Sequence, residues 1–278
     1  MLAAALVLGG CAMAPAPPAP AADTLTPRRI TEIVASPDRS AADRGNDSRR
    51  KPEQMLTFIG LRPGMTVLDL SAGGGYTTEL LARAVGPAGR VYGQSPPRRP
   101  DGVARQPAAP EGAAAPAPAA VPSATAAPAR LTSPQALALR AAHPGLAPIM
   151  AVVQPFEDPV PAPLAAGGLD LVTLMFNYHD LGVMGVDRAQ MNRAVFAALK
   201  PGGVYVIADH AGRPGTGISE SGTLHRIEEA FLRQEVEAAG FRLAAQGGFL
   251  RNPADPRDRN TPEPPQPKDE FVLKFVKP

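Results

Sequence analysis

Histidine and aspartate side chains stand next to each other at two places in this sequence, each after an apolar run of strand length. His179 and Asp180 follow the apolar residues 169–176, and His210 follows a run that ends at Ala208. The unperturbed pKa of a histidine lies near neutral pH, so this side chain suits general acid–base catalysis. We predict His179 as the first catalytic candidate, with Asp180 steadying its imidazole, and His210 as the second. The alternative is that both are structural histidines, satisfied by hydrogen bonds inside the fold.

A metal centre is the other chemistry that these residue types allow, because imidazoles and carboxylates are common ligands of transition metals. Their spacing in the sequence does not require a metal, so we predict none, and a metal-dependent hydrolase stays an alternative. His225 is expected at the start of a helix, as a surface or capping residue. The only cysteine, Cys11, excludes an internal disulfide and a cysteine-based zinc cluster. The residues considered as metal ligands are His179, Asp180, Asp209, His210 and His225.

A glycine-rich turn follows the short apolar strand expected at 66–70. Gly73 and Gly75 let the main chain approach a ligand where a Cβ would clash, and the free N–H groups of the next helix point to the same place. A dinucleotide-binding fingerprint requires a third glycine and then an acidic residue about 20 positions further on. This chain has Thr78 and Gln94 at those positions, so a nicotinamide cofactor is not expected. The alternative is a plain strand–helix turn without a ligand.

The same turn resembles the first motif of class I S-adenosylmethionine-dependent methyltransferases, an acidic residue followed by spaced glycines. Asp69, Gly73 and Gly75 match that motif, and Ser71 replaces its first glycine. The chain is also similar to a group of uncharacterised bacterial methyltransferases that carry NYHD and LKPGG segments. Two later segments are typical of the larger family, namely LKPGG at 199–203 and the Gly-Phe pair at 240–241.

The resemblance implies S-adenosylmethionine as the cofactor and methyl transfer as the reaction. Gly73 and Gly75 would face the methionine part of the cofactor, while Asp69 would order the turn. Gln94 takes the place of the acidic residue that usually accepts both ribose hydroxyls, and Asp158 would reach the adenine. The cofactor-binding residues expected on this basis are Asp69, Ser71, Gly73, Gly75, Gln94, Asp158 and Asn177.

Strands alternate with helices along most of the chain, which favours an α/β fold with an open, doubly wound, mostly parallel sheet. The family resemblance implies seven strands, with the last one antiparallel. The near-continuous apolar run at 169–176 is typical of a central parallel strand, which is buried on both faces. Strands are predicted at 66–70, 90–93, 149–153, 169–176, 204–208, 241–249 and 270–276, and helices at 28–34, 51–59, 76–85, 133–142, 187–199 and 223–239.

The N-terminal residues 1–22 are set apart from the methyltransferase-like domain that we predict at 23–278. Residues 1–10 are apolar, and the segment Leu8-Gly9-Gly10-Cys11 resembles the lipobox of bacterial lipoproteins, in which the cysteine is lipidated. This likeness implies a periplasmic or outer-membrane-attached protein that meets the membrane only through a lipid on Cys11. If the signal is not real, the terminus is a frayed apolar segment and the protein is cytoplasmic.

Residues 96–134 interrupt the domain with a segment rich in alanine and proline. Because it has few large apolar side chains, it cannot bury enough surface to offset the entropy lost on ordering. The alternation of strands and helices resumes after it. We therefore predict a disordered insertion within one domain, not a boundary between two.

The charge and the motifs of the chain indicate which kinds of molecule it binds. The formal net charge is +2 at pH 7, without a long basic run or a basic–aromatic stripe, so nucleic acid is not expected. Amino-group DNA methyltransferases end the fourth strand with Asn/Asp-Pro-Pro-Tyr, whereas this chain has Asn177 and Tyr178 without the prolines. We therefore expect a small-molecule acceptor. The rival function is a non-catalytic ligand-binding lipoprotein that keeps the methyltransferase fold.

Overall fold

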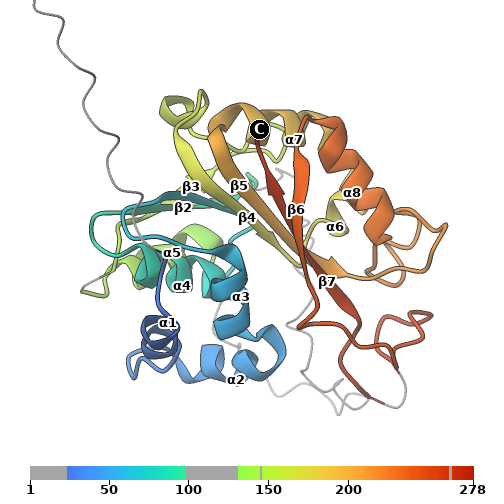
Figure 1. Ribbon diagram of the computed structural model, residues 1–278, viewed down its shortest axis with the longest axis horizontal. Coiled ribbons are helices and arrows are strands. Elements are labelled where there is room, and N and C mark those ends of the chain that lie inside the picture. Colours follow the sequence, from blue (N-terminus) through green and yellow to red (C-terminus); the bar gives the residue numbers. More distant parts are fainter. Residues whose placement is uncertain (1–23, 98–130, 145, 263–264) are drawn as a thin grey trace, which may run out of the picture.

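The computed structural model describes residues 24–97, 131–144, 146–262 and 265–278. Within these ranges the chain forms one seven-stranded sheet with helices on both faces (Figure 1). The predicted anchor segment 1–22 with Cys11, and most of the predicted insertion, lie outside the described residues. Of the helices in these ranges, none is long and apolar enough to cross a membrane.

Seven strands make up the sheet: β1 (Thr66–Leu70), β2 (Arg90–Ser95), β3 (Ile149–Val153), β4 (Leu169–Met175), β5 (Leu199–His210), β6 (Arg242–Gly247) and β7 (Glu270–Val276). Their order is β3-β2-β1-β4-β5-β7-β6, and β7 runs antiparallel to both of its neighbours. The prediction of an open, mostly parallel sheet with an antiparallel last strand is confirmed. The chain passes from β1 to β2 and β3 on one side and returns to β4 on the other side. In open α/β sheets, ligands bind beside the carboxyl ends of the strands at such a switch point.

The helices are α1 (Pro27–Val34), α2 (Ala41–Arg50), α3 (Pro52–Ile59), α4 (Tyr76–Val85), α5 (Ser133–Ala141), α6 (Asp180–Val183), α7 (Arg188–Ala198) and α8 (Glu229–Ala238). One face of the sheet is covered by α1, α3, α4 and α5, and the other face by α7 and α8 (Figure 1). On the first face Leu81 packs with Val67 and Val91, and on the second face Val195 and Leu232 lie in the other half of the core.

The central strands bring their carboxyl ends to one edge of the sheet. Strand β1 has the burial pattern of a strand enclosed on both faces, as parallel strands under two helix layers are. Its Leu70 lies opposite Leu174 of β4, which in turn lies opposite Ile207 of β5. The glycine turn after β1, the segment 176–180 after β4 and the last residues of β5 therefore meet at this edge.

Helix α2 was not predicted, because its sequence contains Gly45 and lacks an apolar stripe. The structure stabilises it by polar contacts instead. The Ser40 hydroxyl caps its first turn by accepting a hydrogen bond from the Asp43 N–H, at 3.0 Å. Asp47 pairs with the buried Arg39 at 2.7 Å. These are polar contacts, so the apolar periodicity from which helices were predicted does not reveal them.

The helix predicted at 223–239 is wrong in its first turns, because α8 begins only at Glu229. The residues before it hold the chain against the end of β5. Arg226 is fully buried and donates to the Ala211 carbonyl at 3.0 Å, and Ile227 forms a bridge to Ala211. Smaller differences are the extension of β5 to 199–210, the end of β6 at 247, and two unpredicted short helices at 162–164 and 180–183.

Candidate functional site

Asp69 is buried near the carboxyl end of β1, where it joins three elements. Its carboxylate accepts hydrogen bonds from the hydroxyls of Thr78 in α4, at 2.6 Å, and of Thr173 in β4, at 2.7 Å. Burial raises the pKa of Asp69 to about 6, against the opposing effect of the two hydroxyls. This geometry agrees with the predicted ordering of the turn, while contact of Asp69 with a cofactor stays a prediction.

The turn between β1 and α4 is open at Gly73 and Gly74. A Cβ on Gly73, whose φ is +53°, would meet only the Ser71 carbonyl oxygen at 3.8 Å, and one on Gly74 would meet nothing within 4 Å. A Cβ on Gly75 would instead lie 2.7 Å from Arg140 and 2.8 Å from Leu137. A ligand can therefore approach the main chain at Gly73 and Gly74, whereas Gly75 is required by the packing of α5.

Arg140 of α5 holds this turn in place. Its Nε donates to the Gly74 carbonyl at 2.6 Å, and its guanidinium pairs with Asp43 of α2 at 2.7 Å and with Glu79 of α4. Arg140 was not predicted at this site, because it lies 66 residues after Gly74 in the chain.

Gln94 of β2 is buried and links two neighbouring segments. Its Oε1 accepts from the Ser71 N–H at 3.0 Å, and its Nε2 donates to the Gln154 carbonyl at 2.7 Å. The amide therefore ties the glycine turn to the end of β3. A contact of Gln94 with the ribose stays a prediction, and it requires these bonds to rearrange.

A chain of hydrogen bonds leads from the glycine turn to the end of β4. The Ser71 hydroxyl donates to Asn177 Oδ1 at 2.6 Å, and Asn177 Nδ2 donates to Asp180 Oδ2 at 2.8 Å. The structure thus brings together two predicted cofactor residues and one predicted catalytic residue. Burial alone would raise the pKa of Asp180, but hydrogen bonds from His179 and His225 outweigh it and hold the pKa below its usual value.

His179 is buried between two carboxylates. Its Nδ1 lies 2.6 Å from Asp209 Oδ1, and its Nε2 lies 3.2 Å from Asp180 Oδ1. Burial would lower the pKa of His179, but Asp209 and Asp180 together raise it to about 10. The two carboxylates therefore favour the protonated imidazole in this arrangement, and the role of His179 as a general base stays a prediction. Asp180 contacts the ring, as its predicted steadying role requires, and Asp209 is a second partner of the ring that was not predicted.

His210 lies next to His179, as expected for residues at the ends of neighbouring strands. The ring centroids of the two are 5.3 Å apart, and the Phe176 ring centroid is 5.7 Å from that of His210. The His210 Nδ1 is 3.0 Å from Glu270 of β7, whose carboxylate also pairs with Arg49 at 3.3 Å. Glu270 was missed, because a carboxylate that begins the last strand carries no motif.

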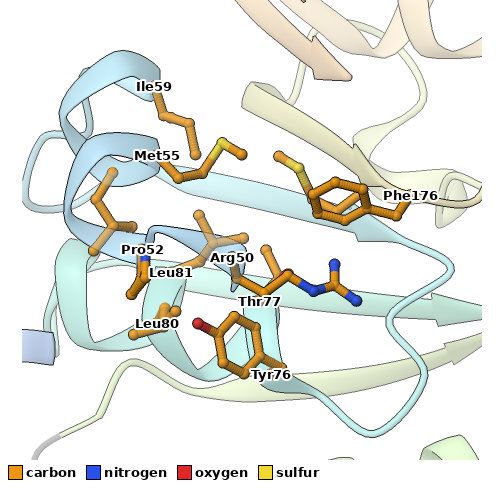
Figure 2. Close-up of a pocket in the computed structure, with 11 residues that line it drawn as sticks. Arg50, Pro52, Met55, Ile59, Tyr76, Thr77, Leu80, Leu81 and Phe176 are labelled. Atoms are coloured by element: carbon orange, nitrogen blue, oxygen red, sulfur yellow. The ribbon is translucent and has the colours of Figure 1, made fainter. Parts of the chain in front are cut away.

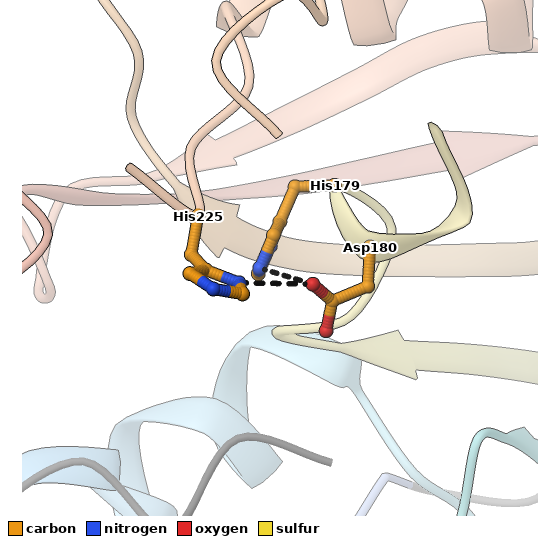
Figure 3. A group of neighbouring side chains, drawn as sticks. All are labelled: His179, Asp180 and His225. Atoms are coloured by element: carbon orange, nitrogen blue, oxygen red, sulfur yellow. Dashed lines mark hydrogen bonds and ion pairs between the residues drawn. The ribbon is translucent and has the colours of Figure 1, made fainter. Parts of the chain in front are cut away.

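His225 belongs to this group, although a surface or capping role was predicted for it. Its Nδ1 lies 3.1 Å from Asp180 Oδ1, and its ring stands almost perpendicular to that of His179, with centroids 5.6 Å apart (Figure 3). It does not begin a helix, and its φ of +51° is a strained value for a residue other than glycine.

Tyr178 and Asp158 do not join this group of histidines and carboxylates. The hydroxyl of Tyr178 donates to Glu235 at 3.0 Å and accepts from Asn192 at 2.9 Å, so this fully buried ring belongs to the core under α7 and α8. Asp158 is exposed in the loop after β3, and its contact with adenine stays a prediction.

A pocket of about 350 Å³, including the part open to solvent, lies between α3, α4 and the end of β4. Figure 2 shows Met55 and Ile59 of α3 across from the Phe176 ring, with Arg50 at the edge. The Arg50 guanidinium stacks 4.2 Å from the Phe176 ring centroid, and the φ of Phe176 is +59°. The pocket is thus apolar inside with a cation at its edge, and it adjoins the segment that carries Asn177.

Known proteins support the interpretation of the sheet and the turn. Residues 50–95 match the family model of the protein-L-isoaspartate(D-aspartate) O-methyltransferases. This segment contains β1, the glycine turn, α4 and β2. The search among curated proteins found no match.

Solved structures match most of the chain. An S-adenosylmethionine-dependent methyltransferase from Aquifex aeolicus is 17% identical with a TM-score of 0.54, and the match covers 91% of this chain and 100% of that one. A Haloferax volcanii protein assigned as a methyltransferase, solved with its activator Trm112, is 18% identical with a TM-score of 0.52, covering 86% and 93%. The chain has the class I methyltransferase fold. A protein of Bacillus halodurans assigned as a methyltransferase shares this fold, at 14% identity and a TM-score of 0.51, covering 81% and 97%.

Proposed function

We propose that this protein is an S-adenosylmethionine-dependent methyltransferase that acts on a small-molecule acceptor. The observation that carries the proposal is the glycine turn at the switch point of a methyltransferase sheet, where Gly73 and Gly74 face open space. Helix α4 begins directly after this turn, so its free N–H groups lie at the same edge. The family-model match over residues 50–95 supports the same segment as the cofactor site.

In the proposed reaction, a lone pair of the acceptor attacks the methyl carbon of the sulfonium. The bond between this carbon and sulfur breaks, its electron pair stays on sulfur, and S-adenosylhomocysteine is released. Because the donor is already activated, the protein chiefly supplies alignment and a site from which water is excluded. A base is required only when the acceptor must lose a proton.

The pocket next to the turn is proposed to take the acceptor. Its lining by Met55, Ile59 and Phe176 favours a small and mostly apolar molecule. Asp180 and His210 are proposed to border this acceptor, because Asp180 follows β4 and His210 is the last residue of the neighbouring β5. Asp209 links the two segments by accepting from the main-chain N–H groups of His179 and His210.

Equilibrium dialysis of the full chain with radiolabelled S-adenosylmethionine tests the proposal. We expect one molecule bound per chain, displaced by unlabelled S-adenosylhomocysteine and not by NAD⁺. Displacement by NAD⁺ would indicate a dinucleotide site, and the absence of binding would refute the cofactor. Formation of S-adenosylhomocysteine with at least one member of a panel of small phenols, thiols and carboxylates separates an enzyme from a protein that only binds the ligand.

A further inference from the structure

Three side chains at the end of β4 converge in a way that methyl transfer does not require. His179, Asp180 and His225 each offer an atom that can bind a metal ion, and these atoms lie within 4.8 Å of one another (Figure 3). The two histidine nitrogens lie 3.2 Å and 3.1 Å from the same oxygen of Asp180. Ligand atoms at the usual distance from a tetrahedral Zn²⁺ are about 3.3 Å apart. The distances from Asp180 Oδ1 to the two imidazoles therefore match those between ligands of one metal ion.

The buried Asp209 gives His179 the support that metal-binding histidines usually have. A ligating imidazole commonly hydrogen-bonds through its second nitrogen to a carboxylate, which fixes the orientation of the ring. Asp209 Oδ1 lies 2.6 Å from His179 Nδ1, so Nε2 is the nitrogen turned toward Asp180 and His225. The Ser221 hydroxyl also donates to the His179 carbonyl at 2.5 Å, which fixes the main chain.

Asp180 is oriented in the same manner. Asn177 Nδ2 donates to its Oδ2 at 2.8 Å, and this bond leaves Oδ1 turned toward both imidazoles. His179 and Asp180 thus each have a hydrogen-bond partner on the side away from the proposed metal, as ligating histidines and carboxylates do in metal sites.

His225 completes the group from a separate segment at the cost of local strain. Its φ of +51° persists because the following residues are fixed, Arg226 through the Ala211 carbonyl and Ile227 through its bridge to Ala211. Strained main-chain positions of this kind cluster at functional sites. The His225 side chain is 30% exposed, so the group is open to solvent on this side.

We propose that His179, Asp180 and His225 bind one divalent first-row transition metal ion of the Zn²⁺ type. Two imidazoles and one carboxylate suit Zn²⁺, Fe²⁺ or Co²⁺ better than Mg²⁺, which prefers oxygen ligands. Three protein ligands leave coordination positions for water or for an oxygen of the acceptor, which the metal would polarise. Metal binding by the protein alone does not rest on the proposed methyl transfer.

Calorimetric titration of the metal-free full chain with ZnCl₂, and visible absorption with CoCl₂, test this site. We expect one ion per chain and a d–d absorption band from bound Co²⁺. His225→Asn removes a half-exposed ligand and keeps a residue type that tolerates positive φ. Asp180→Asn keeps the shape of the second ligand. Each should weaken Zn²⁺ binding by at least about 100-fold, the upper range seen even for outer-shell partners.

His143→Ala is the matched control, because His143 is an exposed histidine, 3.9 Å from Asp38. This variant should bind Zn²⁺ as the wild type does.

Asp209→Asn tests the residue that supports His179. It should weaken Zn²⁺ binding by about 10- to 100-fold. Thermal melts of the metal-free variants check that each is folded at the temperature of the titration. The proposal is overturned if the wild type binds no Zn²⁺, if His225→Asn binds it as tightly as the wild type, or if His143→Ala abolishes binding. S-adenosylhomocysteine binding is measured separately on metal-free protein, so the failure of one proposal is distinguished from the failure of the other.

Discussion

The carboxylate of Asp209 fixes His179 at two points, through the imidazole Nδ1 at 2.6 Å and through the main-chain N–H at 2.7 Å. It also accepts a hydrogen bond from the His210 N–H at 2.8 Å. Asp209 is fully buried at the end of β5, and His179 follows the neighbouring β4. One side chain therefore holds both histidines of the carboxyl edge in position.

Replacing this carboxylate should be costly. Asp209→Asn leaves one oxygen where three N–H donors converge, and it removes the charge opposite a buried histidine. We expect the free energy of unfolding to fall by about 3 kcal/mol or more, as for other broken buried pairs. Urea unfolding measures the change, and the exposed Asp158→Asn, which should shift stability by less than about 0.5 kcal/mol, is the control. Equal effects of the two substitutions would contradict the role given to Asp209.

Asp69 predicts a specific dependence of stability on pH. Its pKa in the folded protein is about 6, against a usual value of 3.8. The folded state therefore holds the Asp69 proton more tightly than the unfolded state does. The stabilisation by this bound proton is complete below pH 3.8 and is lost as the pH rises through 6. The ionised carboxylate costs about 3 kcal/mol at neutral pH, since one pKa unit corresponds to about 1.4 kcal/mol.

The variant Asp69→Asn should remove this dependence. Urea unfolding of both proteins between about pH 4 and 8 gives the difference in stability between them. We expect the wild type to lose stability relative to the variant up to about pH 6.5 and to run parallel to it above that. A constant difference over the whole range would show that Asp69 does not titrate as the burial predicts.

Arg140 should contribute more to stability than an exposed arginine does. Arg140→Gln leaves the buried carboxylates of Asp43 and Glu79 without their shared cation and frees the Gly74 carbonyl. We expect a loss of about 2–4 kcal/mol. Arg28→Gln, which removes a pair whose arginine is 90% exposed, should cost less than about 1 kcal/mol. Urea midpoints of the two variants measure the losses of stability. Similar losses in both variants would contradict the role given to Arg140.

Two buried tyrosines make a matched pair. Tyr178→Phe removes a hydroxyl that bonds to Glu235 and Asn192, and should cost about 1–2 kcal/mol. Within the described part of the chain, the buried Tyr205 hydroxyl has no hydrogen-bond partner, so Tyr205→Phe should be neutral or stabilising. Thermal unfolding of both variants checks the order. A larger loss from Tyr205→Phe would contradict the assignment of partners.

The sheet could be predicted from the sequence because each strand and the glycine turn are recognisable from a short continuous segment. The apolar runs that become β1 and β4 are buried on both faces, and the glycine turn carries its own motif. Helix α2 could not be predicted in this way. Its stability comes from ion pairs such as Asp43 with Arg140, whose two members are far apart in the chain.

The site was predicted only in part for the same reason. Sequence placed His179, Asp180 and His210 at neighbouring strand ends, and the structure brings them together. The sequence does not show which carboxylate faces which imidazole, and here Asp209 faces His179 while Glu270 faces His210. His225 was assigned to a helix start, because its strained φ arises from tertiary contacts of the two residues that follow it.

Calorimetric titration of the full chain with S-adenosylhomocysteine tests the central claim most directly. Gly74 has an ordinary φ and room for a Cβ, so Gly74→Val should keep the melting temperature while it fills the space that the cofactor needs. Gly45→Val, at an exposed position of α2 with similar room, is the control. We predict one binding site in the wild type and in the control, and none in Gly74→Val. No binding by the wild type, or equal binding by Gly74→Val, would contradict a cofactor site at this turn.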